Sequence, residues 1–459
     1  MKFTNNCGAI IRFPLPGAVM FPEEKIRNEV SIMQFLLEKS PIPVPSIFRW
    51  GETKESPSDL GPFIIMNYIH HKGSMGGLLE TPGRQVEQRP VLNPDLKPAR
   101  LEALYGKLAN IVLSLSTLSL KRIGSLDKND RFTWEVLHRP LSYSMNEIVQ
   151  LGTLPRSKLP TNTYGNASSY FEALADLHIS HLKSQRNEAD VEADVEADVE
   201  ADVEADVEAD VEADVEADVE ADDIRRKFVA RFLFRKLVRD QEQRKEWIFH
   251  NNGPFPIWCD DFRPENILVD EADNITGVVD WEFTYTAPVE FSHAPPWWLL
   301  LKKPEDWSKG LDDWCTEYKK PLQTFLDAMR KCEDEATQER RLMEGQRLSS
   351  RMRDSWQSGD FWIMYAARNN FVFDAIYWKK IDQRFFGPTT YEDDNICDVW
   401  RKRLHLLEPV EKELMEEHVN LKLKERNTFR LAWDPDEYTV GWIKRMKEIR
   451  RKEGKEVNI

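Results

Sequence analysis

The hydrophobic pattern predicts a strand-rich start to the chain and a mostly helical remainder. Before residue 70, short β-branched and aromatic runs near Gly or Pro predict three strands, at Ala9–Pro14, Ser46–Trp50 and Phe63–Ile69. Between the first two, apolar residues recur at helical spacing and predict a helix from about Glu23 to Lys39. Its apolar face consists of Ile26, Val30, Met33 and Leu37. We therefore expect a small sheet with one helix at the start of the chain.

After residue 70 the apolar period is mainly that of helices. Amphipathic helices are predicted in four places: Leu101–Leu115, Tyr170–Leu182, Ile224–Glu242, and most of the chain from Trp307 onward. Three short strands interrupt them: Phe255–Cys259, Ile267–Val269 and Ile275–Val279. The polar residues 270–274 (DEADN) predict a turn that joins the last two strands as a hairpin.

Composition indicates a large globular protein and excludes several classes. The 459 residues are 41% hydrophobic, which is enough for a sizeable core. A membrane-spanning helix needs about 18 consecutive apolar residues, and the sequence has no such run. The five cysteines form no C-x-x-C pair, and the first residues lack the pattern of a secretory signal. We therefore expect a cytoplasmic protein with no membrane and no nucleic-acid partner, and we interpret the basic tail 442–455 as a solvated helix face.

Residues 188–222 form an acidic tetrapeptide repeat, EADV eight times followed by EAD. Its nine Glu and nine Asp carry a charge of −18 against −16 for the whole chain, so the remainder is nearly neutral. A four-residue period drifts around any helix, and like charges at i, i+4 repel each other. We therefore expect a solvated, mostly disordered insertion in a surface loop between two helices.

The strongest chemical signal lies between Ile257 and Glu282, where the chain reads IWCDDFRPENILVD and then VVDWE. Asp261 follows one predicted strand, Asn266 opens the next, and Asp280 ends the third. Phosphoryl transfer needs a carboxylate that accepts the proton of the acceptor hydroxyl, and oxygen ligands for Mg²⁺. The spacing therefore predicts Asp261 as the catalytic base, with Asn266 and Asp280 as metal ligands.

A purely structural interpretation of these residues competes with the catalytic one. Asp is common in turns, and D-x-x-x-x-N alone matches many sequences by chance. The strand context and the V-V-D-W ending at Asp280 favour catalysis. Asp260 is the alternative base, but the spacing to Asn266 favours Asp261. Cys259 is expected to be a small buried residue and not a nucleophile.

This segment resembles the fungal branch of the aminoglycoside phosphotransferase-like family, which has the protein-kinase-like fold. Residues 104–126 (LYGKLANIVLSLSTLSLKRIGSL), 139–146 (RPLSYSMN) and 281–301 are similar to the same family, so the resemblance covers most of the chain outside the repeat. It implies a two-lobed α+β fold. The N-lobe would be small and β-rich (residues 1–69), and the C-lobe would be large and helical (residues 70–459), with the catalytic loop at 257–282.

The resemblance also implies roles for residues of the N-lobe. ATP would bind at the hinge near Met66–Ile69, where Asn67 and Ile69 would contact it. Arg12 stands at the position of the family's phosphate-contacting Lys, and Glu29 would be its partner on the helix.

Several departures from the family bear on activity. The family's H-G-D is Cys259-Asp260-Asp261 here, so the His that braces the catalytic loop is absent, and Arg12 is a bulkier, forked cation than Lys. The G-D-P that follows the metal-binding Asp is replaced by residues 287–290 (APVE). Two strands and a phosphate-covering loop before Ile10 would need roughly 15 residues, more than the chain has there. We therefore expect a truncated N-lobe, and a native start upstream of Met1.

The sequence thus predicts a small-molecule kinase that uses ATP and Mg²⁺ to phosphorylate a hydroxyl of an unidentified metabolite. The alternative is a degenerate kinase-fold protein that binds nucleotide or a partner without catalysis, which the absent His and covering loop favour. A protein kinase is a weaker alternative, because no D-F-G, A-P-E or activation segment is present.

Overall fold

The computed structural model describes residues 8–57, 60–84, 88–151, 153–185, 209–388 and 398–425, with the backbone alone at 209–218. The chain divides into two compact units. The first comprises Met1–Asn146, Thr161–Ala167 and Phe249–Met364, and the second Glu147–Pro160, Ser168–Ile248 and Tyr365–Ile459. Within these residues, no helix is both long enough and apolar enough to cross a membrane.

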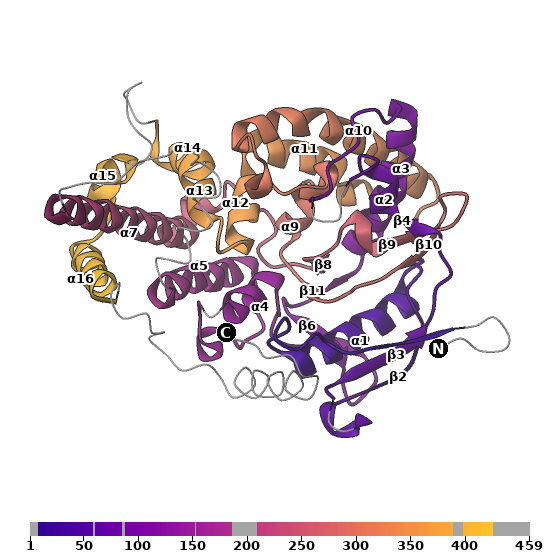
Figure 1. Ribbon diagram of the computed structural model, residues 1–459. Coiled ribbons are helices and arrows are strands. Elements are labelled where there is room, and N and C mark those ends of the chain that lie inside the picture. Colours follow the sequence, from indigo (N-terminus) through magenta and orange to yellow (C-terminus); the bar gives the residue numbers. More distant parts are fainter. Residues whose placement is uncertain are drawn as a thin grey trace. The chain divides into compact units, whose positions relative to one another are not determined.

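The first unit begins with an antiparallel sheet of three strands in the order β1-β3-β2 (Figure 1). They are β1 (Ala9–Arg12), β2 (Ile47–Gly51) and β3 (Phe63–Asn67). In the register of the first pair, Ala9 lies opposite Asn67 and Arg12 lies opposite Ile64. The predicted strands at the start of the chain are therefore present, and Arg12 ends the strand that forms one edge of this sheet.

Helix α1 (Pro22–Lys39) lies against this sheet, as Figure 1 shows. Pro22 suits the first helical position because its missing N–H needs no partner there, and the chain leaves the helix before Pro41. The apolar face was predicted correctly except at Leu37, which is 44% exposed. The buried stripe instead passes through Leu36 and Phe35, whose ring packs against Trp134.

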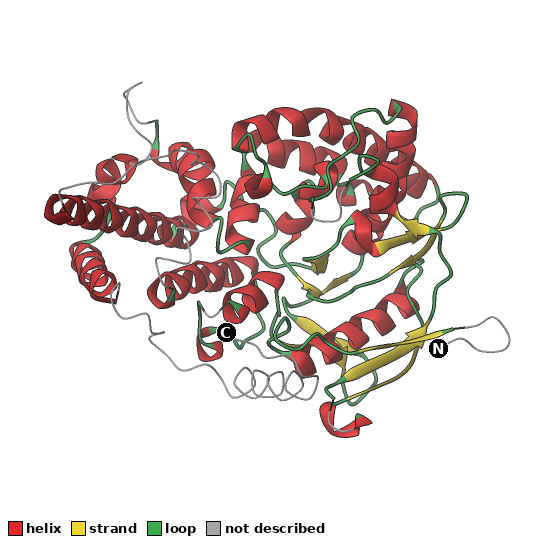
Figure 2. Cartoon of the chain, in the orientation of Figure 1, coloured by secondary structure: helices red, strands yellow, loops and turns green. Residues whose placement is uncertain are grey.

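The rest of the first unit combines helices with short antiparallel pairings (Figure 2). Its elements are β4 (Gly73–Ser74), α2 (Met75–Leu79), α3 (Pro98–Thr117), β5 (Ser119–Leu120), β6 (Ser125–Lys128), β7 (Trp134–His138), β8 (Phe255–Cys259), β9 (Ile267–Val269), β10 (Ile275–Val278), β11 (Thr284–Thr286), α9 (Val289–His293), α10 (Leu311–Gln338) and α11 (Ser349–Ser358). The two long helices α3 and α10 pack together, with the Tyr105 and Phe325 rings 5.9 Å apart.

The division between units does not fall at the predicted lobe boundary after residue 69. Helix α1 contacts β6 and β11, which lie far along the chain, as well as its own sheet. The small sheet buries its apolar face by packing against this helix. The predicted N-lobe and the catalytic loop therefore belong to one unit.

The second unit is helical. Its helices are α7 (Ala209–Arg239), α8 (Gln241–Arg244), α13 (Phe373–Ile376), α14 (Asp382–Phe386), α15 (Val399–Arg403) and α16 (Pro409–Glu425), while α4 (Tyr143–Gln150), α5 (Ala167–Ser184) and α12 (Asp360–Arg368) have residues in both units. Arg231 of α7 is buried and donates to both carboxylate oxygens of Asp374, at 2.6 and 2.7 Å. This pairing compensates a charge that would otherwise be costly to bury.

The expectation of a disordered repeat is corrected for residues 209–222, which belong to α7. Ala221 packs with Ile224 and Val419 in a buried cluster, and Asp222 forms ion pairs with Arg225 and Arg401. Extending an existing helix costs far less than starting one, so the packed part of α7 continues into the repeat despite its weak propensity. Residues 188–208 and the basic tail 442–455 lie outside the part of the chain that the structure describes.

Candidate active site

Two loops of the first unit carry the residues of the predicted catalytic segment. One joins β8 to β9 and contains Asp261 and Asn266; the other joins β10 to β11 and contains Asp280. Strand β8 pairs with β11, and β9 pairs with β10, so the four strand ends hold the loops side by side. Backbone hydrogen bonds join the loops directly, from Asp260 N to Phe283 O at 3.2 Å and from Val279 N to Asn266 O at 2.9 Å.

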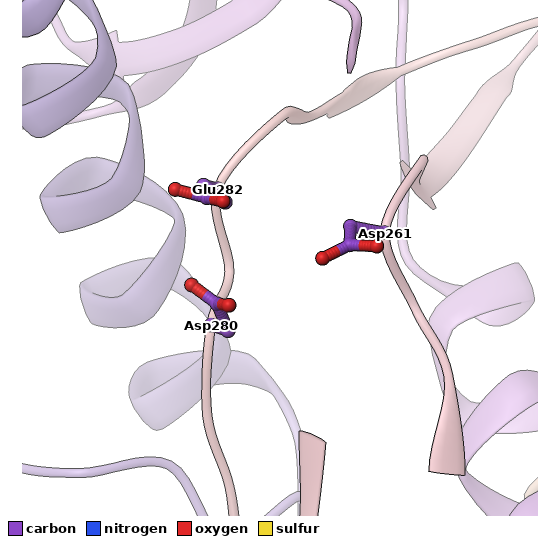
Figure 3. A group of neighbouring side chains, drawn as sticks. All are labelled: Asp261, Asp280 and Glu282. Carbon is purple, nitrogen blue, oxygen red and sulfur yellow. The ribbon is translucent and has the colours of Figure 1, made fainter. Parts of the chain in front are cut away.

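Three carboxylates converge between these loops. Asp261, Asp280 and Glu282 each place one oxygen within 4.8 Å of the others. Figure 3 shows the carboxylate of Asp261 pointing from its loop toward the segment that carries the other two. Carboxylate oxygens are the ligands that Mg²⁺ prefers, so this donor set fits a hard divalent cation.

Asn266 and Asp261 are linked within their loop. The side-chain amide of Asn266 donates through Nδ2 to the backbone oxygen of Asp261 at 2.9 Å. Its amide oxygen, Oδ1, is the atom that could serve as a ligand. Asn266 is 8% exposed and lies at the end of a single turn of 3₁₀ helix, Pro264–Asn266, directly before β9.

Asp280 has a backbone conformation that side chains rarely adopt. Its φ is 65°, and Phe283 nearby has a φ of 55°. The left-handed region costs a residue other than Gly roughly 1–2 kcal/mol, although Asp tolerates it better than most. Such strain collects at functional sites, where surrounding contacts hold it in place.

The Asp261 carboxylate lies in an environment that favours its protonated form. Burial raises the pKa of Asp261 to about 6; Arg263 opposes this rise, and the carboxylates of Asp280 and Glu282 add to it. A general base works best when its pKa lies near the working pH. With this raised pKa, Asp261 is better suited to accept a proton than an Asp with an ordinary pKa.

Arg12 connects the N-terminal sheet, helix α1 and the carboxylates. Its Nη1 donates to Glu29 Oε1 at 2.7 Å, while Nη2 pairs with Asp280 and lies 3.3 Å from Glu282. Burial raises the pKa of Glu29, whereas the cations Arg12 and Lys25 oppose the rise. The ion pair that the resemblance implied is therefore present, and it reaches the predicted metal ligand Asp280 as well.

Sequence reasoning missed two residues of this group, Lys25 and Glu282. Lys25 is buried in α1, forms an ion pair with Glu282 and has its Nζ 3.7 Å from Glu29 Oε2. One signal was available, since Lys and Glu at i, i+4 face the same side of a helix. The other was the two-residue step from Asp280 to Glu282, which in extended chain returns to the same side.

Asp260 and Cys259 have structural partners. The Asp260 carboxylate accepts from Trp258 Nε1 at 2.7 Å and from the Tyr143 backbone N–H at 3.1 Å. The Cys259 thiol lies 3.8 Å from the carbonyl oxygen of Glu282, and burial raises its pKa, so it stays neutral. Cys259 therefore links the two loops at the position where the family has its His.

The predicted hinge residues lie at the end of β3. Asn67 closes the sheet: its Oδ1 accepts from the Ser46 backbone N–H at 2.6 Å. Ile69 packs onto the β9–β10 hairpin, where a Cβ at Gly277 would collide with its side chain. The contacts of Asn67 and Ile69 with a nucleotide stay a prediction.

Two strand-held loops gather three carboxylates beside the pair of Arg12 and the buried Glu29, an arrangement that is compatible with phosphotransfer. The chain belongs to the phosphotransferase enzyme family, whose model matches residues 5–291. The predicted α+β fold, with a small strand-rich N-terminal region and a large helical C-terminal region, is confirmed. The family match does not single out the fungal branch, which stays a prediction.

Comparison with individual proteins adds little to this assignment. The chain matches none of the curated proteins with which it was compared. Among solved structures it is similar to an ethanolamine kinase from Plasmodium vivax, with 11% sequence identity, a TM-score of 0.33, and coverage of 90% of this chain and 79% of that chain. A TM-score this low carries no argument about the acceptor.

Proposed function

We propose that this protein is a small-molecule kinase that transfers the γ-phosphate of ATP to a hydroxyl group of a metabolite, with Mg²⁺ as cofactor. The observation that carries the proposal is the convergence of Asp261, Asp280 and Glu282 from two strand-held loops, with Arg12 paired to the last two. Membership of the family supports phosphotransfer as such. The nucleotide, the metal and the hydroxyl acceptor are parts of our proposal.

Each residue has a role in this reaction. Asp261 accepts the proton of the acceptor hydroxyl as the new O–P bond forms, and its raised pKa suits that task. Asp280 and Asn266, through its Oδ1, hold Mg²⁺. The bound metal would neutralise charge on the phosphates. Phosphate transfer of this kind depends on positioning and charge, so the rigidity of the two loops is itself a contribution.

The N-terminal residues would hold the nucleotide. Arg12 contacts the phosphates, and the buried Glu29 is its partner on helix α1. Asn67 and Ile69 line the hinge for the adenine. The location would be cytoplasmic, in keeping with the free thiols of Cys259, Cys315 and Cys332. The alternative of a kinase fold without catalysis rests on Cys259 at the position of the family's His, whereas the convergence of the three carboxylates favours catalysis.

A screen of a metabolite extract tests the proposal. The purified full chain is incubated with the extract, ATP and Mg²⁺, and products that have gained a phosphoryl group are identified by mass spectrometry. The expected result is one class of phosphorylated metabolite with wild-type protein and none with Asp280→Ala or with Mg²⁺ chelated. Absence of any product, together with absence of Mg²⁺-dependent ATP binding, would contradict the proposal.

A further inference from the structure

Lys25 is a buried cation of the site, and the proposed reaction gives it no role. Its side chain is 2% exposed, whereas that of Arg12 is 28% exposed. Arg12 can therefore reach a bound nucleotide, but Lys25 is enclosed by protein. Burying an ammonium group is costly unless carboxylates compensate it, so its partners define what it does.

The partners of Lys25 are two of the three carboxylates that Arg12 also contacts. Lys25 pairs with Glu282 and lies 3.7 Å from Glu29, while Arg12 pairs with Glu29, Asp280 and Glu282. Two cations thus compensate three carboxylates. Because Lys25 and Glu29 belong to α1 and Glu282 follows Asp280, the Lys25 contacts join the helix directly to the loop of the proposed metal ligand.

The proposed reaction changes the partners of Arg12. A metal on Asp280 would compete with Arg12 for this carboxylate, and the guanidinium would turn toward the phosphates. Glu29, which is 1% exposed, would then lose its forked partner, and an uncompensated buried carboxylate is strongly unfavourable. Lys25 cannot turn toward the phosphates as Arg12 does, because protein encloses its side chain. It therefore stays beside Glu29 and Glu282.

We propose that Lys25 is a positioning residue of the phosphotransfer site: it holds Glu29 and Glu282, so that Arg12 is free for the nucleotide phosphates and Asp280 for the metal. This inference rests on the proposed function. Without the ammonium group of Lys25, Arg12 would be the remaining cation beside Glu29, Asp280 and Glu282. These carboxylates would then hold Arg12 away from the phosphates. The site would also become more negative, which favours a bare divalent cation and disfavours a phosphate.

Calorimetric titration of the full-length Lys25→Met variant tests whether Lys25 frees Arg12 for the phosphates. Two ligands are compared, Mg²⁺ alone and Mg²⁺ with a non-hydrolysable ATP analogue. Loss of a charge-assisted contact predicts nucleotide binding weaker on the order of tenfold, while Mg²⁺ alone binds more tightly than to wild type. Lys39→Met, at the exposed end of the same helix, is the matched control and should match wild type for both ligands.

Opposite changes in the two affinities support the inference, because a merely structural Lys25 would not produce them. Unchanged affinities, or affinities that fall together in a folded variant, overturn it. Should Lys25→Met not fold, the variant Lys25→Met/Glu282→Gln is compared with Glu282→Gln alone. Weaker nucleotide binding in the double variant supports the inference, and equal binding overturns it. Wild-type protein that binds no Mg²⁺–nucleotide would overturn the proposed function as well, which distinguishes the two failures.

Discussion

The side-chain amide of Asn266 donates to the backbone oxygen of Asp261 at 2.9 Å. The proposed metal ligand therefore also fixes the loop of the proposed base. The Asn266→Asp variant separates these tasks, because it keeps an oxygen ligand but loses the donor. We expect Mg²⁺ binding to persist while phosphate transfer falls by roughly tenfold to hundredfold, since a small displacement of a catalytic group is costly.

The measurement for this variant is the rate of transfer to the acceptor identified in the metabolite screen, together with a Mg²⁺ titration. Asn110→Asp, an exposed residue of α3, introduces the same chemical change away from the site and should leave the rate unaltered. A wild-type rate for Asn266→Asp would mean that the hydrogen bond does not position Asp261.

A second prediction concerns the buried ion pair of the helical unit. Arg231→Met leaves the Asp374 carboxylate without its bidentate partner, and such a loss typically costs about 3–5 kcal/mol. We expect the free energy of unfolding, measured with urea, to fall by that amount. Arg239→Met on the same helix removes an exposed pair with Glu172 and should cost less than about 1 kcal/mol. Equal effects of the two substitutions would contradict this account of the core.

The same pair allows a check of the mechanism. The variant Arg231→Met/Asp374→Asn also removes the carboxylate charge that Arg231→Met leaves unpaired, so it should recover part of the lost stability. No recovery would show that packing, rather than the unpaired carboxylate, dominates the loss.

A third prediction concerns the repeat. Deleting the eight complete EADV units, residues 188–219, should leave the melting temperature nearly unchanged. Extending the deletion through Asp222 removes the buried Ala221 and the ion pairs of Asp222 with Arg225 and Arg401. A loss of about 1–2 kcal/mol, which is typical of such contacts, lowers the melting temperature by a few degrees in a chain of this size. Indistinguishable melting curves for the two deletions would refute a packing role for residues 221–222.

A fourth prediction is a pH dependence of stability that arises from His178. Burial, with help from Arg231, lowers the pKa of His178 to about 3, and its ring is held neutral between Ala367 O and Asn370. In the unfolded chain His178 takes up a proton near the ordinary pKa of about 6.5, whereas in the native chain it stays neutral at that pH. The stability that His178 contributes is therefore complete above that pH and is lost as pH falls from about 6.5 toward 3, by up to about 1.4 kcal/mol per pH unit.

Urea unfolding between pH 7 and pH 4.5 checks this sign. His178→Gln keeps a donor and an acceptor but does not titrate, so its stability should fall less steeply on acidification than that of wild type. His405→Gln, at an exposed position, should retain the wild-type slope. Identical slopes for wild type and His178→Gln would show that His178 is not the source.

Local patterns were sufficient to predict the main elements of the fold. The apolar period of the sequence predicts helices α1 and α3. Strand-forming residues on both sides of a polar turn predict the β9–β10 hairpin. The short strands β4, β5, β6, β7 and β11 were not predicted, because no apolar run bounded by a recognisable turn marks them in the sequence. Strands β5 and β11 pair with β8, which is distant from them in the chain, whereas β6 and β7 pair with each other.

The candidate site was predictable where its residues lie in one segment. Asp261, Asn266 and Asp280 follow from the spacing of strands and turns, and the family resemblance indicated the pair of Arg12 and Glu29. The contact of Lys25 with Glu282 joins residues on separate elements, and no local pattern indicates which helix faces which loop. The continuation of α7 into the repeat was missed for a similar reason, since helix propagation from packed residues outweighs local propensity.

The central claim is that Asp261 acts as the base in transfer of phosphate from ATP to a hydroxyl, and one comparison tests it most directly. Asp261→Asn keeps the size of the side chain and removes its ability to accept the proton. The rate of phosphate transfer at saturating Mg²⁺ and ATP is measured for this variant and for wild type, with ATP affinity determined by calorimetry in parallel. We predict unchanged ATP affinity and a rate lower by roughly 10²–10⁴-fold; a wild-type rate in Asp261→Asn would contradict the account.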